Sequence, residues 1–399
     1  MINHLKQLVQ DTVEKNKDEI IRIEKYIHEN PEYAYEEFKA CDILVNYMES
    51  QGFEVKKGIC NIPTAFKATY KGPKEGYNIG ILGEYDAFRG LGHACGHNLM
   101  AGMAVGAGVA LKQVIDEVGG SVTVFGTPAE ESGGAKVLMV ERGAFKDIDA
   151  AMTLHAANET VVKDVSISKT DLEIHFYKKD AKDVVEKTPK ENIEIITEII
   201  ELINKVGDKK VEAVDPKLVG MSLRGIENTK EDHYSARFRV RAFEKKTKNE
   251  ILEDLYKLCN LIGEATNTRF EHNIAIEYGH PHNPYEDIRN NETIEELLKK
   301  NFIDLGEEVK PRDSLTSIGC TDVGNVTHEI PALQSYIKVC ENLRVHTPEF
   351  IEACGDERGA RAVIVGAKAM AMTAVDLLCS KDNMESVKKD FQHMKERFQ

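Results

Sequence analysis

A cysteine, two histidines and two acidic residues lie close together in the stretch from Gly83 to Gly102. Cys95 and His97 stand two residues apart, a spacing at which a thiolate and an imidazole can bind the same metal ion. This spacing alone is a weak signal, because a single Cys-x-His pair more often belongs to a packed core. Glu84 and Asp86 directly follow a short apolar run, and open α/β sheets bind ligands where their strands end. The stretch is therefore a candidate ligand or metal site.

Further side chains with metal-binding or acid–base chemistry follow other apolar runs that have the character of buried strands. Because the carboxyl ends of parallel strands meet at one edge of a sheet, these side chains are predicted to converge on one cleft. Four such groups at consecutive strand ends make a chance arrangement the weaker explanation. The candidates are Cys95 and His97 after the run 79–82, Glu130 and Glu131 after 121–125, His155 after 150–154, and His346 from the C-terminal part.

The adjacent pair Glu130-Glu131 is the most informative of these groups. One carboxylate can bind a metal ion while its neighbour stays free as a general base. A metal ion lowers the pKa of bound water from 15.7 towards about 7, so that a nearby carboxylate can take its proton. Taken alone, a Glu-Glu pair more often favours the dipole at a helix start. Together with the cysteine and the histidines at the other strand ends, the pair predicts metal-assisted hydrolysis.

Composition excludes several classes of protein. The chain has 399 residues, 42% hydrophobic and 30% charged, which is typical of a globular protein of two or three domains. A net charge of −15 without a block of Lys and Arg residues argues against nucleic acid as a binding partner. No run near 20 apolar residues and no export signal are apparent, so we expect no membrane span. The eight cysteines are scattered without a Cys-x-x-Cys pair, which indicates reduced thiols and a cytoplasmic location.

The first part of the chain is predicted to be α/β. Two amphipathic helices come first, and strands then alternate with helices, which favours right-handed crossovers and a mostly parallel sheet. Similar signals return near the C-terminus, before a charged, mostly solvated tail. The expected helices are 5–28, 36–51, 97–117, about 135–142, 293–305 and 359–378, and the expected strands are 65–70, 78–82, 121–125, 150–154 and 333–339.

The pattern changes near Ser168 to the order β-α-β-β-α-β, which indicates a ferredoxin-like unit inserted into the larger domain. Its strands are expected at 172–177, 218–223, 234–243 and 270–278, and its helices at 192–206 and 248–266. The segment 279–285 would return the chain, with His280 and His282 as structural or surface residues. We therefore predict a catalytic domain of residues 1–168 and 283–399 and an inserted domain of residues 169–282.

Several motifs resemble the M20 metallopeptidases, in particular their amidohydrolase branch (subfamily D) with aminoacylase-like, aminobenzoyl-glutamate hydrolase and dipeptidase members. The resemblance spans most of the chain and its motifs are specific. The matching segments are His28-Glu-Asn-Pro-Glu32, Glu84-Tyr-Asp-Ala, Gly92-His-Ala-Cys-Gly-His-Asn, Gly126-Thr-Pro-Ala-Glu-Glu, Leu154-His155, Cys320-Thr-Asp-Val-Gly-Asn325 and His346-Thr.

The resemblance implies a zinc-peptidase-like α/β catalytic domain with an inserted lid, and hydrolysis of an amide bond in an N-acyl amino acid or dipeptide-like substrate. It implies two divalent ions, Mn²⁺ or Zn²⁺, and a homodimer formed through the lid domain. Glu130 would be the catalytic base, and the metal ligands would be Cys95, His97, Glu131, His155 and His346. Residues that would orient ligands or contact substrate are Asp86, His93, Asn228, Arg239 (or Arg241) and Asn325.

The sequence departs from the family in the inserted domain. Relatives carry a Gly-x-x-x-His-Ala motif after the first strand of the lid, and its histidine crosses the dimer to the reacting carbonyl. The segment from Tyr177 to Pro189 has no histidine, and losing one such donor costs about 10²–10³ in turnover. A metal-binding relative with weak or redirected catalysis, acting as a binding or regulatory subunit, is therefore the alternative.

Two further alternatives concern single residues near the predicted site. Phe88-Arg89 stands where relatives usually carry Leu-Pro, and Arg89 would favour an acidic substrate or be a solvated surface residue. A cysteine enzyme with Cys95 as nucleophile is the least favoured alternative, because no separate His/Asn partner is apparent.

Overall fold

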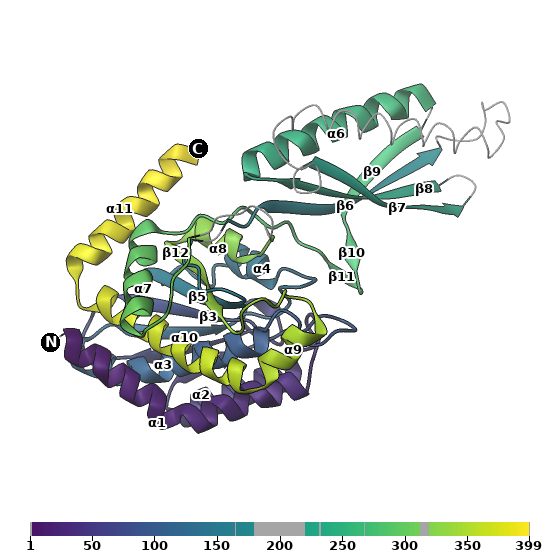
Figure 1. Ribbon diagram of the computed structural model, residues 1–399. Helices are drawn as coiled ribbons and strands as arrows, with labels where there is room; N and C mark the ends of the chain where they lie inside the picture. Colours follow the sequence, from purple (N-terminus) through teal and green to yellow (C-terminus); the bar gives the residue numbers. More distant parts are fainter. Residues whose placement is uncertain are drawn as a thin grey trace. The chain divides into compact units, whose positions relative to one another are not determined.

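A computed structural model describes residues 2–163, 165–178, 220–230, 233–266, 268–311 and 319–398. The chain forms two compact units (Figure 1). The first comprises residues 1–164, 288–315 and 325–399, and the second comprises 165–287 and 316–324. From the sequence, the chain is predicted to enter the inserted unit at 168/169 and to leave it at 282/283, a few residues from the divisions in the structure. The sequence does not predict that 316–324 belongs with the inserted unit.

The first unit contains a six-stranded sheet in the order β1-β2-β4-β3-β5-β12. The four strands β4, β3, β5 and β12 are parallel, while β1 and β2 are antiparallel additions at one edge. The predicted mostly parallel α/β sheet is therefore confirmed. The strands are β1 (Glu54–Lys57), β2 (Phe66–Lys71), β3 (Asn78–Gly83), β4 (Ser121–Gly126), β5 (Ala150–Ala157) and β12 (Ala332–Lys338).

Helix α3 (His97–Val118) lies at the centre of the helical packing, in contact with α1 (Ile2–Glu29), with α10 (Glu357–Leu378) and with the sheet. Small residues allow this close approach. A Cβ atom added at Gly106 would come within 3.1 Å of side chains from both neighbouring helices. The same packing places His97, at the first turn of α3, at the edge of the sheet where β3 ends.

By length and composition, α3 is apolar enough to cross a membrane, which the sequence reading did not anticipate. In the structure 89% of its most apolar window is buried inside the protein. Its apolar surface is covered by α1, α10 and the sheet, so the packing of this unit accounts for it. Helices α10 and α11 (Lys381–Phe398) pass the same test only as a pair that is bent by 99°.

The C-terminal region contains more helix than the sequence indicates. A short helix begins at Val323, within the matching motif 320–325, and another follows His346. The expected solvated tail is an 18-residue helix that buries Met384 and Val387. Short or strongly charged segments give little apolar periodicity, which explains why they were missed. The remaining helices are α2 (Phe38–Ser50), α4 (Ala135–Glu141), α7 (Glu292–Asp304), α8 (Val323–Glu329), α9 (Pro348–Gly355) and α11 (Lys381–Phe398).

The second unit contains a four-stranded antiparallel sheet in the order β7-β8-β6-β9. Helix α6 (Lys245–Thr266) packs on one face of it, against an apolar core that includes Leu172 and Phe238. The helix predicted at 192–206 lies outside the described residues. The predicted linker 279–285 forms part of a small hairpin, and His282 is buried. The strands are β6 (Ser168–Lys178), β7 (Gly220–Lys230), β8 (His233–Ala242), β9 (Thr268–Ile274), β10 (Ile276–Glu277) and β11 (His280–Pro281).

One buried acid of the first unit should make stability depend on pH. Glu24 of α1 is fully buried and accepts a hydrogen bond from Asn98 at 2.9 Å. Burial raises its pKa to about 8. The folded protein therefore binds one more proton than the unfolded chain between about pH 4.5 and 8, and stability falls as pH rises through this window. The loss across this window is on the order of 4 kcal/mol.

Glu24→Gln is expected to flatten this pH dependence. The comparison is the urea midpoint of wild type and variant at pH 5 and pH 8. Glu19→Gln is the control, because the pKa of Glu19 is lowered by its hydrogen bond to Arg22 and this residue does not titrate in the window. Equal slopes for wild type and Glu24→Gln would show that Glu24 is not the group responsible.

Candidate metal centre

The site lies where the central parallel strands end. Strand β3 leads into Glu84 and Asp86, and the chain then turns at Gly96 (φ 76°) to start α3 at His97. Strand β4 leads into the loop 127–134, which carries the two adjacent glutamates. His155 lies inside β5, because that strand is longer than the sequence indicates. Neighbouring strands thus supply these side chains to one edge of the sheet.

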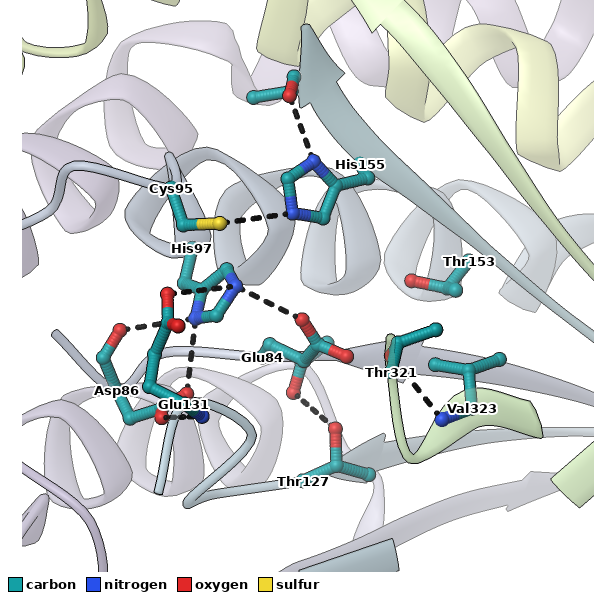
Figure 2. Close-up of polar contacts among 12 residues, drawn as sticks. Glu84, Asp86, Cys95, His97, Thr127, Glu131, Thr153, His155, Thr321 and Val323 are labelled. Carbon is teal, nitrogen blue, oxygen red and sulfur yellow. Dashed lines mark hydrogen bonds and ion pairs between the residues drawn. The ribbon is translucent and has the colours of Figure 1, made fainter. Parts of the chain in front are cut away.

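The five predicted ligands come together around Cys95. Figure 2 shows four of them, Cys95, His97, Glu131 and His155. Its Sγ atom lies 3.3 Å from Nε2 of His155 and 3.3 Å from Nε2 of His346. Potential ligand atoms of Cys95, His97 and His155 all lie within 4.8 Å of one another, and the same holds for Cys95, Glu131 and His346. The two groups share the cysteine, an arrangement with the composition of a site for two neighbouring metal ions.

Asp86 fixes the orientation of His97. Its Oδ1 atom lies 3.0 Å from Nδ1 of His97, and its Oδ2 atom accepts a hydrogen bond from the backbone N–H of Glu131 at 2.9 Å. A carboxylate on one ring nitrogen sets the tautomer and leaves the other nitrogen to a metal. Nε2 of His97 is directed towards the cluster, 3.8 Å from Oε1 of Glu131. This geometry agrees with the orienting role that the resemblance implies for Asp86.

The charges around His97 indicate that the site fits a cation. Nε2 of His97 is buried beside two carboxylates, 3.1 Å from Oε2 of Glu84 and 3.8 Å from Oε1 of Glu131. Oε1 of Glu131 is itself buried and has no hydrogen-bond partner among the residues that the structure describes. Buried polar atoms are normally satisfied, so this carboxylate oxygen calls for a binding partner. Imidazole nitrogen, carboxylate oxygen and thiolate sulfur form a donor set suited to Zn²⁺ and related divalent ions. The residues present therefore fit a divalent metal site.

The ionisation of the cluster supports the same conclusion. Burial raises the pKa of Glu131 to about 8, and burial and Glu131 raise the pKa of the Cys95 thiol well above its usual value. Burial lowers the pKa of His155 to about 4, which keeps this imidazole neutral. A nearby divalent cation would favour the carboxylate and the thiolate, as metal ligation requires. Without one, Cys95 lacks the low pKa of a cysteine nucleophile.

Glu130 is buried, with 8% of its surface exposed. One of its potential ligand atoms lies within 4.8 Å of those of Glu84 and His97. It therefore stands beside the ligand cluster, where a general base for a metal-activated water is required.

The site also contains a buried ion pair that sequence reasoning missed. Nζ of Lys136, on α4, lies 2.7 Å from Oε1 of Glu84, and both side chains are at most 1% exposed. The other oxygen of Glu84 lies 3.1 Å from Nε2 of His97. A lysine in the first turn of a helix gives no signal of burial in the sequence. Its position shows that Glu84 adds negative charge to the centre and that Lys136 offsets part of it.

Lys136→Met is expected to lower the free energy of unfolding by about 3–5 kcal/mol, because it leaves the buried Glu84 carboxylate without its counter-charge. Urea unfolding of the metal-free protein measures the effect. Lys71→Met is the matched control, since Lys71 pairs with Glu75 on the surface, where ion pairs contribute little. Equal small effects of both substitutions would contradict a structural role for the Lys136–Glu84 pair.

The other predicted residues lie elsewhere or make other contacts. His93 is outside the ligand groups, and its Nε2 atom lies 3.0 Å from the carbonyl oxygen of Ile27. Burial lowers its pKa to about 3, so it joins the loop to α1 as a neutral ring. Arg239 forms a two-pronged ion pair with Asp171 inside the second unit. Its guanidinium therefore already has a carboxylate partner.

Three expectations concern residues about which less can be said. Asn325 lies in α8. Asn228 lies in β7, but its side chain is outside the described residues, as is the segment after Lys178 where the lid histidine is missing. Arg89 stacks on the ring of Tyr33 at 4.5 Å and lies 3.7 Å from Glu36, so its charge is partly neutralised.

Sequence comparison identifies similar proteins along nearly the whole chain. The model of peptidase family M20/M25/M40 matches residues 80–370. The chain is 25% identical to a Homo sapiens Xaa-Arg dipeptidase over 413 residues, which covers 96% of this chain and 90% of the relative. It is 36% identical to one of the subunits of the Escherichia coli p-aminobenzoyl-glutamate hydrolase over 168 residues, or 37% of this chain and 34% of the relative.

Solved structures show the same fold. A putative aminohydrolase from methicillin-resistant Staphylococcus aureus superposes with a TM-score of 0.76 at 17% identity, covering 94% of this chain and all of that one. A dinuclear metal-binding M20 peptidase from Bacillus subtilis gives a TM-score of 0.69 at 19% identity, covering 92% and 99%. At these identities the likeness supports the α/β fold, as predicted from the sequence.

Proposed function

The chain belongs to peptidase family M20/M25/M40 and is a metallopeptidase or metallo-amidohydrolase, and we propose that it hydrolyses an amide bond in a dipeptide or N-acyl amino acid with Glu130 as general base. The observation that supports this is the convergence of Cys95, His97, Glu131 and two further histidines on one cluster, with Glu130 beside it. Two divalent ions, Mn²⁺ or Zn²⁺, would polarise the amide carbonyl and acidify the attacking water.

The chain's own residues have separate tasks in this proposal. Cys95, Glu131 and the three histidines 97, 155 and 346 hold the ions, and Asp86 keeps the proton of His97 on Nδ1. Glu130 takes a proton from the attacking water and later delivers it to the leaving amine. Lys136 limits the repulsion among the buried carboxylates by pairing with Glu84.

For the substrate, we favour a dipeptide with a basic C-terminal residue. The relative that matches nearly the full length is named an Xaa-Arg dipeptidase. The net charge of −15 produces a negative potential that attracts cations. Arg89, the residue that would favour an acidic substrate, lies beside Glu36, which partly neutralises it.

The test is a substrate panel with Mn²⁺- or Zn²⁺-loaded protein. It includes dipeptides ending in arginine, lysine, leucine or glutamate, N-acetyl amino acids and p-aminobenzoyl-glutamate, with amine release followed by mass spectrometry. We expect turnover, with the highest kcat/KM for dipeptides ending in arginine or lysine. No turnover on any member by protein that holds its metals would overturn the hydrolase proposal. A preference for glutamate would overturn the basic-substrate proposal alone.

One observation favours a second candidate function. The segment from Tyr177 to Pro189 lacks the histidine that relatives use at the reacting carbonyl. The chain would then be a metal-binding subunit with weak or redirected catalysis. Fast turnover that disappears in a Glu130 variant would contradict this alternative. We also expect the protein to be cytoplasmic and to form a homodimer through residues 169–282. Light scattering of the purified protein and of a variant in that domain would test the homodimer.

A further inference from the structure

The loop that carries Glu130 and Glu131 contacts a buried carboxyl group from the N-terminal region. Glu37 has no exposed surface. It occupies the N-cap position of α2, yet its side chain makes no capping hydrogen bond. Instead, its Oε1 atom accepts hydrogen bonds from the backbone N–H groups of Ala129, at 2.9 Å, and Tyr35, at 3.0 Å. The side chain is thus committed to the neighbouring loop and not to its own helix.

Both residues bound by Oε1 of Glu37 have an unusual backbone conformation. Ala129 has φ 58° and Tyr35 has φ 63°, in the left-handed region that residues other than glycine rarely adopt. Such conformations persist when surrounding contacts hold them, and they concentrate at functional sites. Ala129 immediately precedes Glu130, so its φ angle sets the direction in which the two glutamates leave the loop. The hydrogen bond from the Ala129 N–H to Glu37 fixes the peptide group on the N-terminal side of that angle, and the bond from the Tyr35 N–H holds the Glu37 carboxyl group in place.

The same N-terminal segment contacts the other end of the loop. A Cβ atom added at Gly133 would lie 2.5 Å from the ring of Tyr35, so this ring packs directly on the loop backbone. The loop is closed by a hydrogen bond of 2.7 Å from the N–H of Gly134 to the carbonyl oxygen of Ala129. Residues 35–37 therefore contact both ends of the loop, although they lie outside the range 80–370 matched by the family model.

We propose that Glu37 is a positioning residue for the catalytic centre: it holds Ala129 in the left-handed conformation that directs Glu130 to the water and Glu131 to the metal. This inference rests on the proposed roles of those two glutamates. The Oε2 atom of Glu37 accepts a third hydrogen bond, from the Thr64 hydroxyl at 2.9 Å. That bond fixes the carboxyl group but does not touch the loop, so it offers a control.

Glu37→Leu tests the proposal, because leucine fills the volume but accepts no hydrogen bond. We expect kcat to fall about 10–100-fold with KM changed less than about 3-fold, and metal affinity to fall about 10–100-fold, the usual effect of removing a group that orients a ligand. Metal affinity is measured by competition with a chromogenic chelator. Glu37→Gln keeps one carbonyl oxygen for the two N–H groups and should recover most of both losses. Thr64→Val should leave both quantities within about 2-fold.

A second substitution separates positioning from packing. Glycine adopts positive φ without strain, so Ala129→Gly in the Glu37→Leu background should recover part of the lost kcat and metal affinity. Wild-type kcat and metal affinity in Glu37→Leu would overturn the proposal. So would losses of equal size in Thr64→Val, or losses that Ala129→Gly does not relieve. If the wild type turns over no substrate, the proposed function fails, and the metal affinities still decide the role of Glu37.

Discussion

Glu130→Gln is expected to lower kcat by about 10²–10⁴-fold, the range attributed to general acid–base catalysis, while the protein keeps its metal ions. The amide has nearly the same shape as the carboxylate but cannot accept a proton. Glu130 lies beside the ligand cluster and not within the two groups that contain Cys95. Loss of turnover without loss of metal would therefore identify Glu130 as the base.

The control for this experiment is the adjacent residue. Glu131→Gln removes a carboxylate that the structure places with Cys95 and His346, so it should lower metal affinity together with turnover. Elemental analysis of both dialysed variants distinguishes the two roles. If Glu130→Gln loses metal and Glu131→Gln retains it, the two assignments are reversed. If Glu130→Gln keeps more than about a tenth of wild-type kcat, another group is the base.

Removing the metal ions with a chelator is expected to abolish turnover, and adding Mn²⁺ or Zn²⁺ should restore it. Metal binding should also release protons at pH 7, because burial raises the pKa of Glu131 to about 8 and raises that of Cys95 well above its usual value. Both groups are protonated in the metal-free protein, and ligation requires their deprotonated forms. Metal affinity should therefore rise with pH from 6 to 8. It should rise further above pH 8, as the thiol is deprotonated.

Calorimetric titration in two buffers with different ionisation enthalpies measures the released protons. Cys95→Ser should reduce the number released at pH 7, because the hydroxyl of serine keeps its proton more readily than a thiol. Metal binding without proton release would show that Glu131 and Cys95 are already ionised. Full activity after chelation, with no metal left by elemental analysis, would instead support Cys95 as a nucleophile and contradict the metal mechanism.

These two experiments together separate the functional alternatives. A working metallohydrolase loses turnover both in Glu130→Gln and after chelation. A metal-binding subunit shows proton-linked metal binding without turnover, and a cysteine enzyme is insensitive to the chelator. The absence of a histidine between Tyr177 and Pro189 bears only on the choice between the first two.

Local patterns in the sequence were enough to predict the class of fold and the residue types at the site. Apolar runs and helical periodicity are local properties, so the strands around 79–82, 121–125 and 150–154 and the helix that starts at His97 could be read from neighbouring residues alone. Because the carboxyl ends of parallel strands share one edge, the same runs predicted that Cys95 and Glu131 would meet. Short or charged elements, such as β1 and α11, could not be predicted in this way, because they carry almost no periodic signal.

Which charges pair and which loops are held in place could be seen only in the three-dimensional packing of the chain. Lys136 and Glu84 are 52 positions apart, and Glu37 and Ala129 are 92 apart, so no local pattern connects either pair. In the sequence these residues resemble ordinary helix-terminal charges, and Arg239 resembles a free substrate contact, whereas it pairs with Asp171. Burial makes each of these groups require a specific partner, and that partner is supplied by whichever distant segment the fold brings alongside.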